Sequence, residues 1–236
     1  MAYSFDFSKI PVDNYREILR NQYLLPGRKI LHNNIDASFS AICNAGIGNL
    51  CELKDALSTT KKMIEFSEKS KLSKDYLTIL RREIGSLECK TVLIKDFPGI
   101  EAEMLDRVSN AGFISSKDYY EFYESVKDMK KIAQKLGISQ ELAEELYSLC
   151  NLVRINGVGA IAAKSFSEAG YKSISDIANT SAEEMLVKVS EVNNIKRYYK
   201  TKLGTKDMQF CIDFAKIIWT VENSGKINGG KTLIEI

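Results

Sequence analysis

Two glycine-containing segments of this sequence could hold a phosphate group, and the better one is RINGVG over residues 154–159. Glycines let a backbone turn tightly, and the amides at the start of the next helix can bind a phosphate with help from the helix dipole. Such a contact reaches only backbone phosphate and carries no sequence information. We therefore expect Gly157, Val158 and Gly159 to contact phosphate. Arg154 and Lys164 stand beside this turn as the nearest basic residues. The alternative is that the turn only packs two helices together.

The second segment is GKINGGKT over residues 225–232, which matches the nucleotide-binding pattern GxxxxGK[ST]. That mechanism needs a helix that opens at the final Lys-Thr, and only four residues follow. We therefore interpret the match as chance. Residues 217–221 and 231–236 are instead β-prone runs on either side of a Gly/Asn-rich turn, which predicts a small C-terminal β-hairpin. A loose tail is the alternative.

A basic stretch lies between these two segments. Its cations are Lys196, Arg197, Lys200, Lys202 and Lys206, interleaved with two tyrosines. Residues 194–236 carry a net charge of +4, so the rest of the chain carries −2 and the total is +2. Cations could follow a phosphate backbone while tyrosine rings stack on bases. The alternative is a solvated helix face with Tyr198 or Tyr199 turned into the core.

Catalytic chemistry has little support in the sequence. There is one histidine, His32, and a turn residue is the simpler interpretation of it. The five cysteines are scattered without a CxxC pair, which is typical of thiols in a reducing compartment. We expect no enzyme activity, no metal and no cofactor. With no apolar run of the ~18 residues that a membrane helix needs, we expect a cytoplasmic protein without a membrane partner.

The elements that must position these residues are predicted to be helices. The chain has three prolines and none after Pro98. Its glycines follow helix-periodic apolar segments, where a left-handed residue ends a helix; Gly46, Gly112, Gly137 and Gly170 are the examples. The sequence therefore predicts an all-α fold of short helices.

A repeat underlies these helices. Ala-Gly-aromatic recurs at Ala111 and Ala169, and the offset of 58 aligns Gly99 with Gly157 without a gap. An offset of 66 aligns Gly46 with Gly112 in the same way. We infer three diverged copies of one helical unit. The expected segments are residues 1–90 with a degenerate first repeat, 91–151 and 152–204 with the second and third repeats, and 205–236 with a C-terminal helix and tail.

The turn at residues 152–159 resembles the helix-hairpin-helix motif, in which Gly-apolar-Gly is followed by a small residue four positions later, here Ala163. Together with LPGRKIL at residues 25–31 and YLTILRREI at residues 76–84, it is similar to a bacterial family of tandem helix-hairpin-helix proteins catalogued as a domain of unknown function. The resemblance implies a SAM-like all-α fold, and it implies no enzyme activity, cofactor or catalytic residue.

The third turn departs from the motif's best phosphate binders, because Ala160 and Ile161 stand where polar or basic residues are usual. The second turn has Glu101 in place of its second glycine, and a carboxylate there repels phosphate. We expect a non-enzymatic protein that contacts DNA or RNA phosphate backbone without sequence specificity. The alternative is a scaffold of degenerate repeats that binds another protein.

Overall fold

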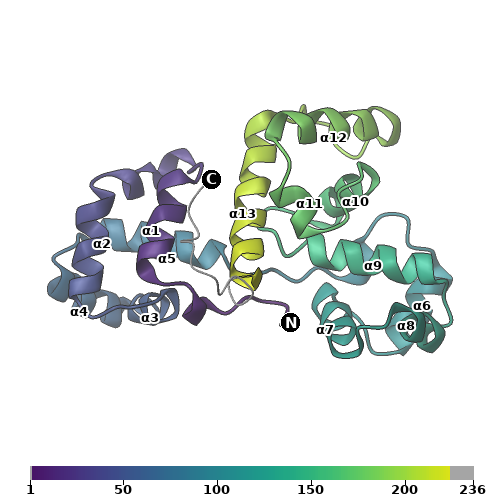
Figure 1. Ribbon diagram of the computed structural model, residues 1–236, viewed down its shortest axis with the longest axis horizontal. Helices are drawn as coiled ribbons and strands as arrows, with labels where there is room; N and C mark the ends of the chain where they lie inside the picture. The colour runs from purple at the N-terminus through teal and green to yellow at the C-terminus, as the bar shows by residue number, and fades with distance from the viewer. Residues whose placement is uncertain (1, 224–236) are drawn as a thin grey trace. The chain divides into compact units, whose positions relative to one another are not determined.

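The structure of the chain is a computed structural model that describes residues 2–223. Within them the fold is all-helical and contains no strand, only two isolated β-bridges, which confirms the predicted all-α class (Figure 1). No helix in the described part of the chain is both long and apolar enough to cross a membrane. The chain divides into two compact units. The N-terminal unit contains Phe5–Glu88 and, of the described residues, also 220–223, and the C-terminal unit contains residues 2–4 and Cys89–Trp219. The predicted segments 91–151 and 152–204 therefore belong to one unit.

The N-terminal unit is built around its longest α-helix. Its helices are α1 (Val12–Asn21), α2 (Ile35–Asn44), α3 (Leu50–Ala56), α4 (Thr60–Ser70) and α5 (Lys74–Ser86), with 3-10 helices over Phe7–Lys9 and Pro26–His32. The α5 helix packs against α3, α4 and the second 3-10 helix. It does so because Leu77, Leu80 and Ile84 recur at helical spacing and are fully buried. His32 ends the second 3-10 helix, and its Nε2 lies 2.8 Å from the carbonyl oxygen of Leu19, as expected of a turn residue.

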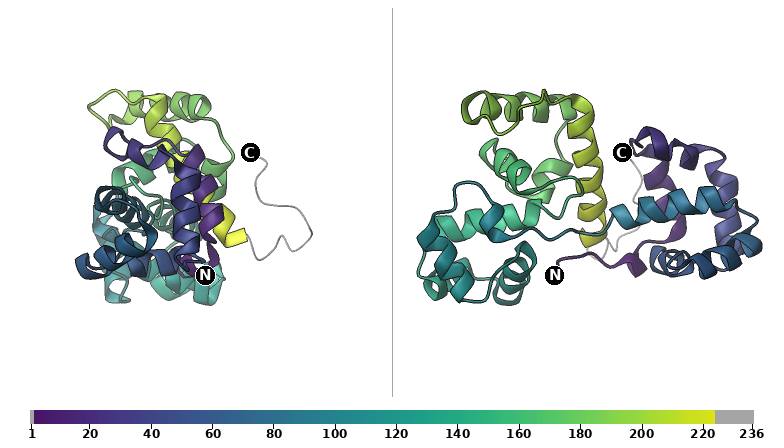
Figure 2. Two further views of the ribbon diagram at one scale, coloured as in Figure 1. Left: turned by 90° about the vertical axis from the view of Figure 1, so that its left-hand side faces the viewer. Right: turned by 180° about the vertical axis from the view of Figure 1, so that it is seen from behind.

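The C-terminal unit has the same plan around α9. Its helices are α6 (Ala102–Asn110), α7 (Ser116–Val126), α8 (Met129–Leu136), α9 (Gln140–Leu152), α10 (Ala160–Glu168), α11 (Ile174–Ala178), α12 (Ala182–Lys196) and α13 (Thr205–Asn223), with a 3-10 helix over Ile94–Asp96. The α9 helix packs against α7, α8 and α10 through buried residues that include Ala143, Leu146 and Leu149. The first part of α13 runs beside the segment from α10 to α12 in both views (Figures 1 and 2).

The predicted repeat is visible in the helix boundaries. The α9 helix begins and ends 66 residues after α5, and α10 begins and ends 58 residues after α6. The caps recur as well: Asn49, Ser115 and Ser173 each accept a hydrogen bond from the amide three residues later. In each case the acidic residue at that third position accepts a bond from the amide just before the cap. The same sequence signals therefore specify the same local structure in all three copies.

The glycines predicted to end helices have the expected conformation. Gly46, Gly112, Gly137 and Gly170 all have positive φ, between 63° and 95°. A residue with a Cβ is disfavoured there, so glycine allows the chain to leave each helix in a tight turn.

The predicted strand at residues 217–221 is wrong. These residues lie within α13, whose buried face contains Cys211, Phe214, Ile217 and Ile218. Burial of this apolar face outweighs the β-propensity of the Ile-Ile-Trp-Thr-Val run, since β-propensity mainly reflects packing context. Its predicted partner at residues 231–236 and the nucleotide-binding pattern at residues 225–232 lie outside the described residues.

Candidate nucleic-acid interface

The third turn exposes two glycines, but the amide of Val158 between them donates a 3.1 Å hydrogen bond to the carbonyl of Ile155 and is not free for the predicted phosphate contact. Gly157 has φ of 84°, Gly159 is extended, and both are exposed, whereas Val158 is 5% exposed and anchors the turn in the core. Gly159 is the N-cap of α10, and no side chain forms a capping hydrogen bond there. The first intrahelical amide bond is made by Ala163 to the carbonyl of Gly159, so the preceding amides of the first turn have no partner within the helix. This is the arrangement that can accept an anion.

Phe210 of α13 packs against one side of this turn. A Cβ added to Gly157 would lie 3.0 Å from Cε1 of Phe210, so glycine is required both by φ and by this close approach. Phe210 is four residues after Lys206, and residues at that spacing share a helix face. Lys206, which is exposed, therefore lies one turn from the residue that contacts Gly157. The beginning of α13 and the third turn are neighbours.

Four further predicted cations lie in or next to the connection between α12 and α13. Lys196 is the last residue of α12, and Arg197 is its left-handed C-cap with φ of 56°. Lys200 and Lys202 follow in the loop, and all four side chains are exposed. Among residues 2–223, none of the four forms an ion pair with a carboxylate. Their charge is therefore available to a ligand.

The two tyrosines in this connection hold it against the protein. Tyr198 donates a 3.1 Å hydrogen bond to Glu168 at the end of α10, and the amide of Tyr199 donates a 2.7 Å bond to Asn193. Burial raises the pKa of Tyr199 to about 12. For Tyr198, burial and the hydrogen bond to the Glu168 carboxylate raise the pKa to about 12. These contacts match the alternative of tyrosines turned toward the core, and they do not leave a free stacking platform.

Arg154 is not placed to contact phosphate. Its side chain is 2% exposed and lies against the ring of Tyr120, with its Cζ 4.5 Å from the ring centroid. Its guanidinium donates hydrogen bonds to the Tyr3 carbonyl (2.7 Å), the Tyr120 hydroxyl (2.9 Å) and Asn151 Oδ1 (2.8 Å). Arg154 thus stabilises the interior of the C-terminal unit, and the prediction that it contacts phosphate is wrong.

Lys164 is also committed elsewhere. Its side chain is 13% exposed, and its Nζ forms an ion pair with Glu145 on α9 and lies 3.6 Å from Glu168. The aliphatic end of the side chain lies over the second turn, 3.8 Å from the place of a Cβ on Gly99. Lys164 therefore links α10, α9 and the second turn, and it too is removed from the predicted phosphate contact.

The other two turns have fewer phosphate-binding features, although the helices that follow them are also without a side-chain cap. Gly99 has φ of 81°, matching Gly157, but the N-cap of α6 is Glu101, and the exposed Glu103 follows it. In the first copy the N-cap of α2 is Asn34, which adopts φ of 50° without any glycine. All three helices lack a side-chain cap, and only the third turn combines this with two glycines and no carboxylate at the N-cap.

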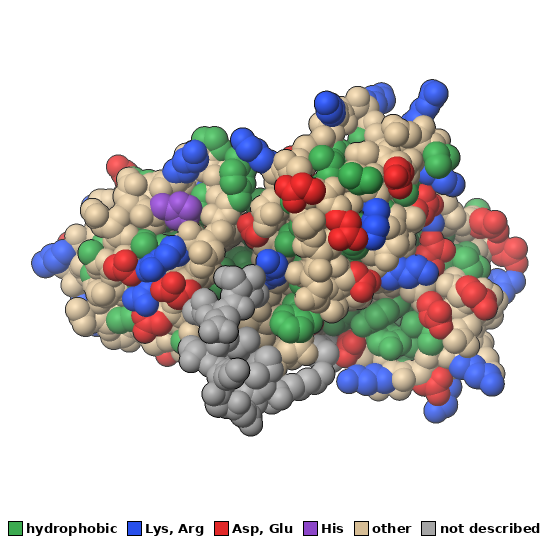
Figure 3. All heavy atoms as spheres, turned by 45° about the horizontal axis from the view of Figure 1, so that its top comes forward, with side chains coloured by type: hydrophobic (Ala, Val, Ile, Leu, Met, Phe, Trp, Pro, Cys, Tyr) green, Lys and Arg blue, Asp and Glu red, His purple; other side chains and the backbone are tan. Residues whose placement is uncertain are grey.

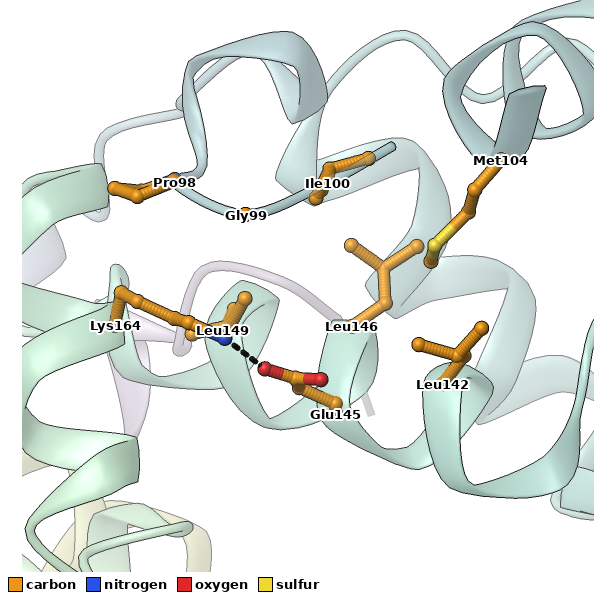
Figure 4. Close-up of a pocket in the computed structure, with 9 residues that line it drawn as sticks. All are labelled: Pro98, Gly99, Ile100, Met104, Leu142, Glu145, Leu146, Leu149 and Lys164. Atoms are coloured by element: carbon orange, nitrogen blue, oxygen red, sulfur yellow. Dashed lines mark hydrogen bonds and ion pairs between the residues drawn. The ribbon is translucent and has the colours of Figure 1, made fainter. Parts of the chain in front are cut away.

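A shallow hollow beside the second turn was not predicted from the sequence. It has about 260 Å3 of open space, and Figure 4 shows it between the second turn and α9, with the Lys164–Glu145 pair at one end. Its lining residues are Pro98, Gly99, Ile100, Met104, Leu142, Glu145, Leu146, Leu149 and Lys164. Since they come from α6, α9, α10 and a turn, no sequence spacing brings them together. In the described part of the chain, no group of three or more His, Cys, Asp or Glu side chains is placed to bind a metal.

Comparison with known families places these features in one class, an all-α domain whose function is unknown. A family model matches residues 98–217, from the second turn to α13. The chain therefore belongs to the family described as a domain of unknown function (DUF4332). No curated protein and no solved structure matches the chain.

Proposed function

We propose that this chain is a non-enzymatic protein of tandem helix-hairpin-helix repeats, with a SAM-like arrangement, that binds the phosphate backbone of DNA or RNA without sequence specificity. The observation that carries the proposal is the uncapped N-terminus of α10, which follows the exposed glycines Gly157 and Gly159. Amides there can donate to a phosphate, and the helix dipole favours the negative charge.

The contact surface consists of the third turn and the exposed cations Lys196, Arg197, Lys200, Lys202 and Lys206. The connection they occupy starts beside the C-terminal end of α10, through Tyr198 and Glu168, and reaches the turn through Phe210. The cations thus follow α10 from one end to the other. Electrostatic contacts of this kind position a protein on nucleic acid and add affinity without reading bases.

Gly159 offers the sharpest test. A Cβ at Gly159 meets no atom within 4 Å and its backbone is extended, so aspartate fits there and caps α10 with its carboxylate. The same carboxylate occupies the anion site. Gly159→Asp should therefore weaken binding about tenfold or more, the equivalent of one lost phosphate contact of about 1.4 kcal/mol, while the folded state is no less stable.

The measurement is fluorescence anisotropy of labelled single- and double-stranded DNA and RNA at two salt concentrations, with thermal unfolding as the stability control. Gly159→Ala leaves the amides free and should bind within about twofold of the wild type, as should Lys164→Gln. Wild-type affinity should fall steeply with salt. The proposal fails if the wild type does not bind at low salt, or if Gly159→Asp binds as tightly as Gly159→Ala.

The second candidate function is a protein-interaction scaffold. It is favoured by the glutamates of the second turn, which repel phosphate, and by the face shown in Figure 3, on which acidic and basic side chains are intermixed. A stable protein complex together with no nucleic-acid binding at low salt would select this function.

A further inference from the structure

The hollow beside the second turn has an apolar lining. Figure 4 shows Ile100 and Met104 on one side and Leu142 and Leu146 of α9 on the other. Leu142 is 40% exposed at its edge. The open space of about 260 Å3 includes solvent outside the protein, so the hollow is shallow and does not enclose a small molecule. It is better suited to an apolar side chain of another protein than to a cofactor.

One carboxylate lines the hollow, and two more follow or precede its lining residues in the chain. Glu145 lines the hollow, and Glu141 is one turn earlier on the same face of α9. Glu101 follows Ile100 directly in the chain and begins α6. Glu101 and Glu141 are exposed, and neither forms an ion pair among the described residues. The one cation in the lining, Lys164, is already paired with Glu145. The hollow is therefore complementary to an apolar side chain flanked by cations.

The end of α12 presents a segment with that chemistry. Ile195 is 79% exposed, more than any other large apolar residue in the described part of the chain. Lys196 and Arg197 follow it directly, and both are exposed and without an ion-pair partner among residues 2–223. A single exposed isoleucine needs no explanation by itself. Its position next to two free cations makes it a match for the hollow and the carboxylates beside it.

We propose that Ile195 of one copy of this chain occupies the hollow of a second copy, with Lys196 and Arg197 facing Glu101 and Glu141. In this contact the copies join head to tail and can grow beyond two, whereas a reciprocal pair, in which each copy fills the other's hollow, would stop at the dimer. Each copy that gives its Ile195 to a neighbour keeps its own hollow open. The small contact area and the exposed charges make the association weak, dependent on concentration and sensitive to salt.

Sedimentation velocity of the full chain, free of nucleic acid, tests this proposal over about 1 to 500 μM. We expect the average mass to rise above that of the monomer as concentration increases, and the rise to be smaller at high salt. Ile195→Asp and Glu141→Lys should each weaken association about tenfold or more, because each places a like charge or a buried charge in the contact. Glu183→Lys makes the same charge change as Glu141→Lys at another exposed position, and should associate like the wild type.

Growth of the wild type beyond the dimer separates a head-to-tail contact from a reciprocal pair, and mixing the two variants tests whether Ile195 and the hollow are the two partners. Ile195→Asp retains an intact hollow and Glu141→Lys retains an intact Ile195, so the mixture should form one-to-one dimers and nothing larger. The proposal is overturned if the wild type remains a monomer at the highest concentration, or if the mixture behaves as the two separate variants do. It also fails if Glu183→Lys loses association to the same extent as Glu141→Lys.

This inference does not rest on phosphate binding, but Lys196 and Arg197 belong to both proposed contacts, so nucleic acid should compete with the association of copies. Glu141 and the other residues of the hollow lie outside the proposed phosphate contact, whereas Gly159 lies outside the proposed contact between copies. Loss of association in Glu141→Lys with nucleic-acid binding retained, and the reverse in Gly159→Asp, distinguishes the failure of one proposal from the failure of the other.

Discussion

The guanidinium Nε of Arg154 donates a 2.7 Å hydrogen bond to the carbonyl oxygen of Tyr3, which lies 151 residues earlier in the chain. This bond ties the beginning of the chain to the end of α9. Tyr3 is held at its other end too, because its hydroxyl donates to the Lys90 carbonyl or shares a hydrogen bond with Ser116 Oγ, each at 2.8 Å. Residues 2–4 therefore belong structurally to the C-terminal unit, although the N-terminal unit follows them directly in sequence.

We predict that Arg154→Met destabilises the C-terminal unit by about 3 kcal/mol or more, because several buried acceptors lose a charged donor. Tyr120→Phe removes only one of these hydrogen bonds and should cost about 1 kcal/mol. The measurement is urea unfolding followed by the fluorescence of Trp219, the single tryptophan, which lies in this unit. A loss in Arg154→Met no larger than that in Tyr120→Phe would contradict the structural role.

The same substitution distinguishes structure from binding. Folded Arg154→Met should bind nucleic acid within about twofold of the wild type, since the side chain is buried and does not reach the ligand. If folded Arg154→Met lost affinity for nucleic acid, Arg154 would have to contact phosphate after all.

Much of the local structure could be predicted from the sequence, because it depends on signals within a few residues. The glycines at positive φ, the caps at Asn49, Ser115 and Ser173, and the recurrence of α5 in α9 all follow from such signals. The roles of Arg154 and Lys164 could not be predicted in this way. Their partners, Tyr3 and Glu145, come from other elements, and only tertiary packing brings them together.

The end of α13 shows that a short sequence pattern can also fit more than one secondary structure. Residues 217–221 are β-prone, yet Ile217 and Ile218 complete the buried face of a 19-residue helix. A short apolar run has no period that separates a strand from a buried helix, so its context decides. The hollow beside the second turn could not be predicted either, because its apolar residues are indistinguishable in sequence from those of the core.

The two matched glycines of the second and third turns should respond differently to alanine. Both have φ above 80°, which costs an alanine about 1 kcal/mol or more. At Gly99 the nearest atoms to an added Cβ belong to the flexible Lys164 side chain, 3.8 Å away. At Gly157 the added Cβ lies 3.0 Å from the Phe210 ring. We therefore expect Gly157→Ala to lose about 1 kcal/mol more than Gly99→Ala in urea unfolding.

A double-mutant cycle checks the cause of that difference. Phe210→Leu removes the ring that contacts Gly157, so Gly157→Ala should cost less in this background than in the wild type. Gly99→Ala should cost the same in both backgrounds. Equal costs for Gly157→Ala with and without the ring would mean that backbone conformation alone requires this glycine.

The phenol of Tyr199 should make the free energy of unfolding fall as the pH rises into the alkaline range. Burial raises its pKa from the usual 10 to about 12, so the folded state keeps a proton that the unfolded chain releases. Its contribution to stability is therefore complete below pH 10 and is lost as the pH rises toward 12. Tyr199→Phe cannot ionise, and its free energy of unfolding should fall less than that of the wild type over this interval.

Unfolding in urea, followed by Trp219 fluorescence at a series of pH values, measures the difference. Parallel pH profiles for the two proteins would show that the Tyr199 hydroxyl titrates in the folded state as it does in solvent, and that the connection between α12 and α13 does not enclose it.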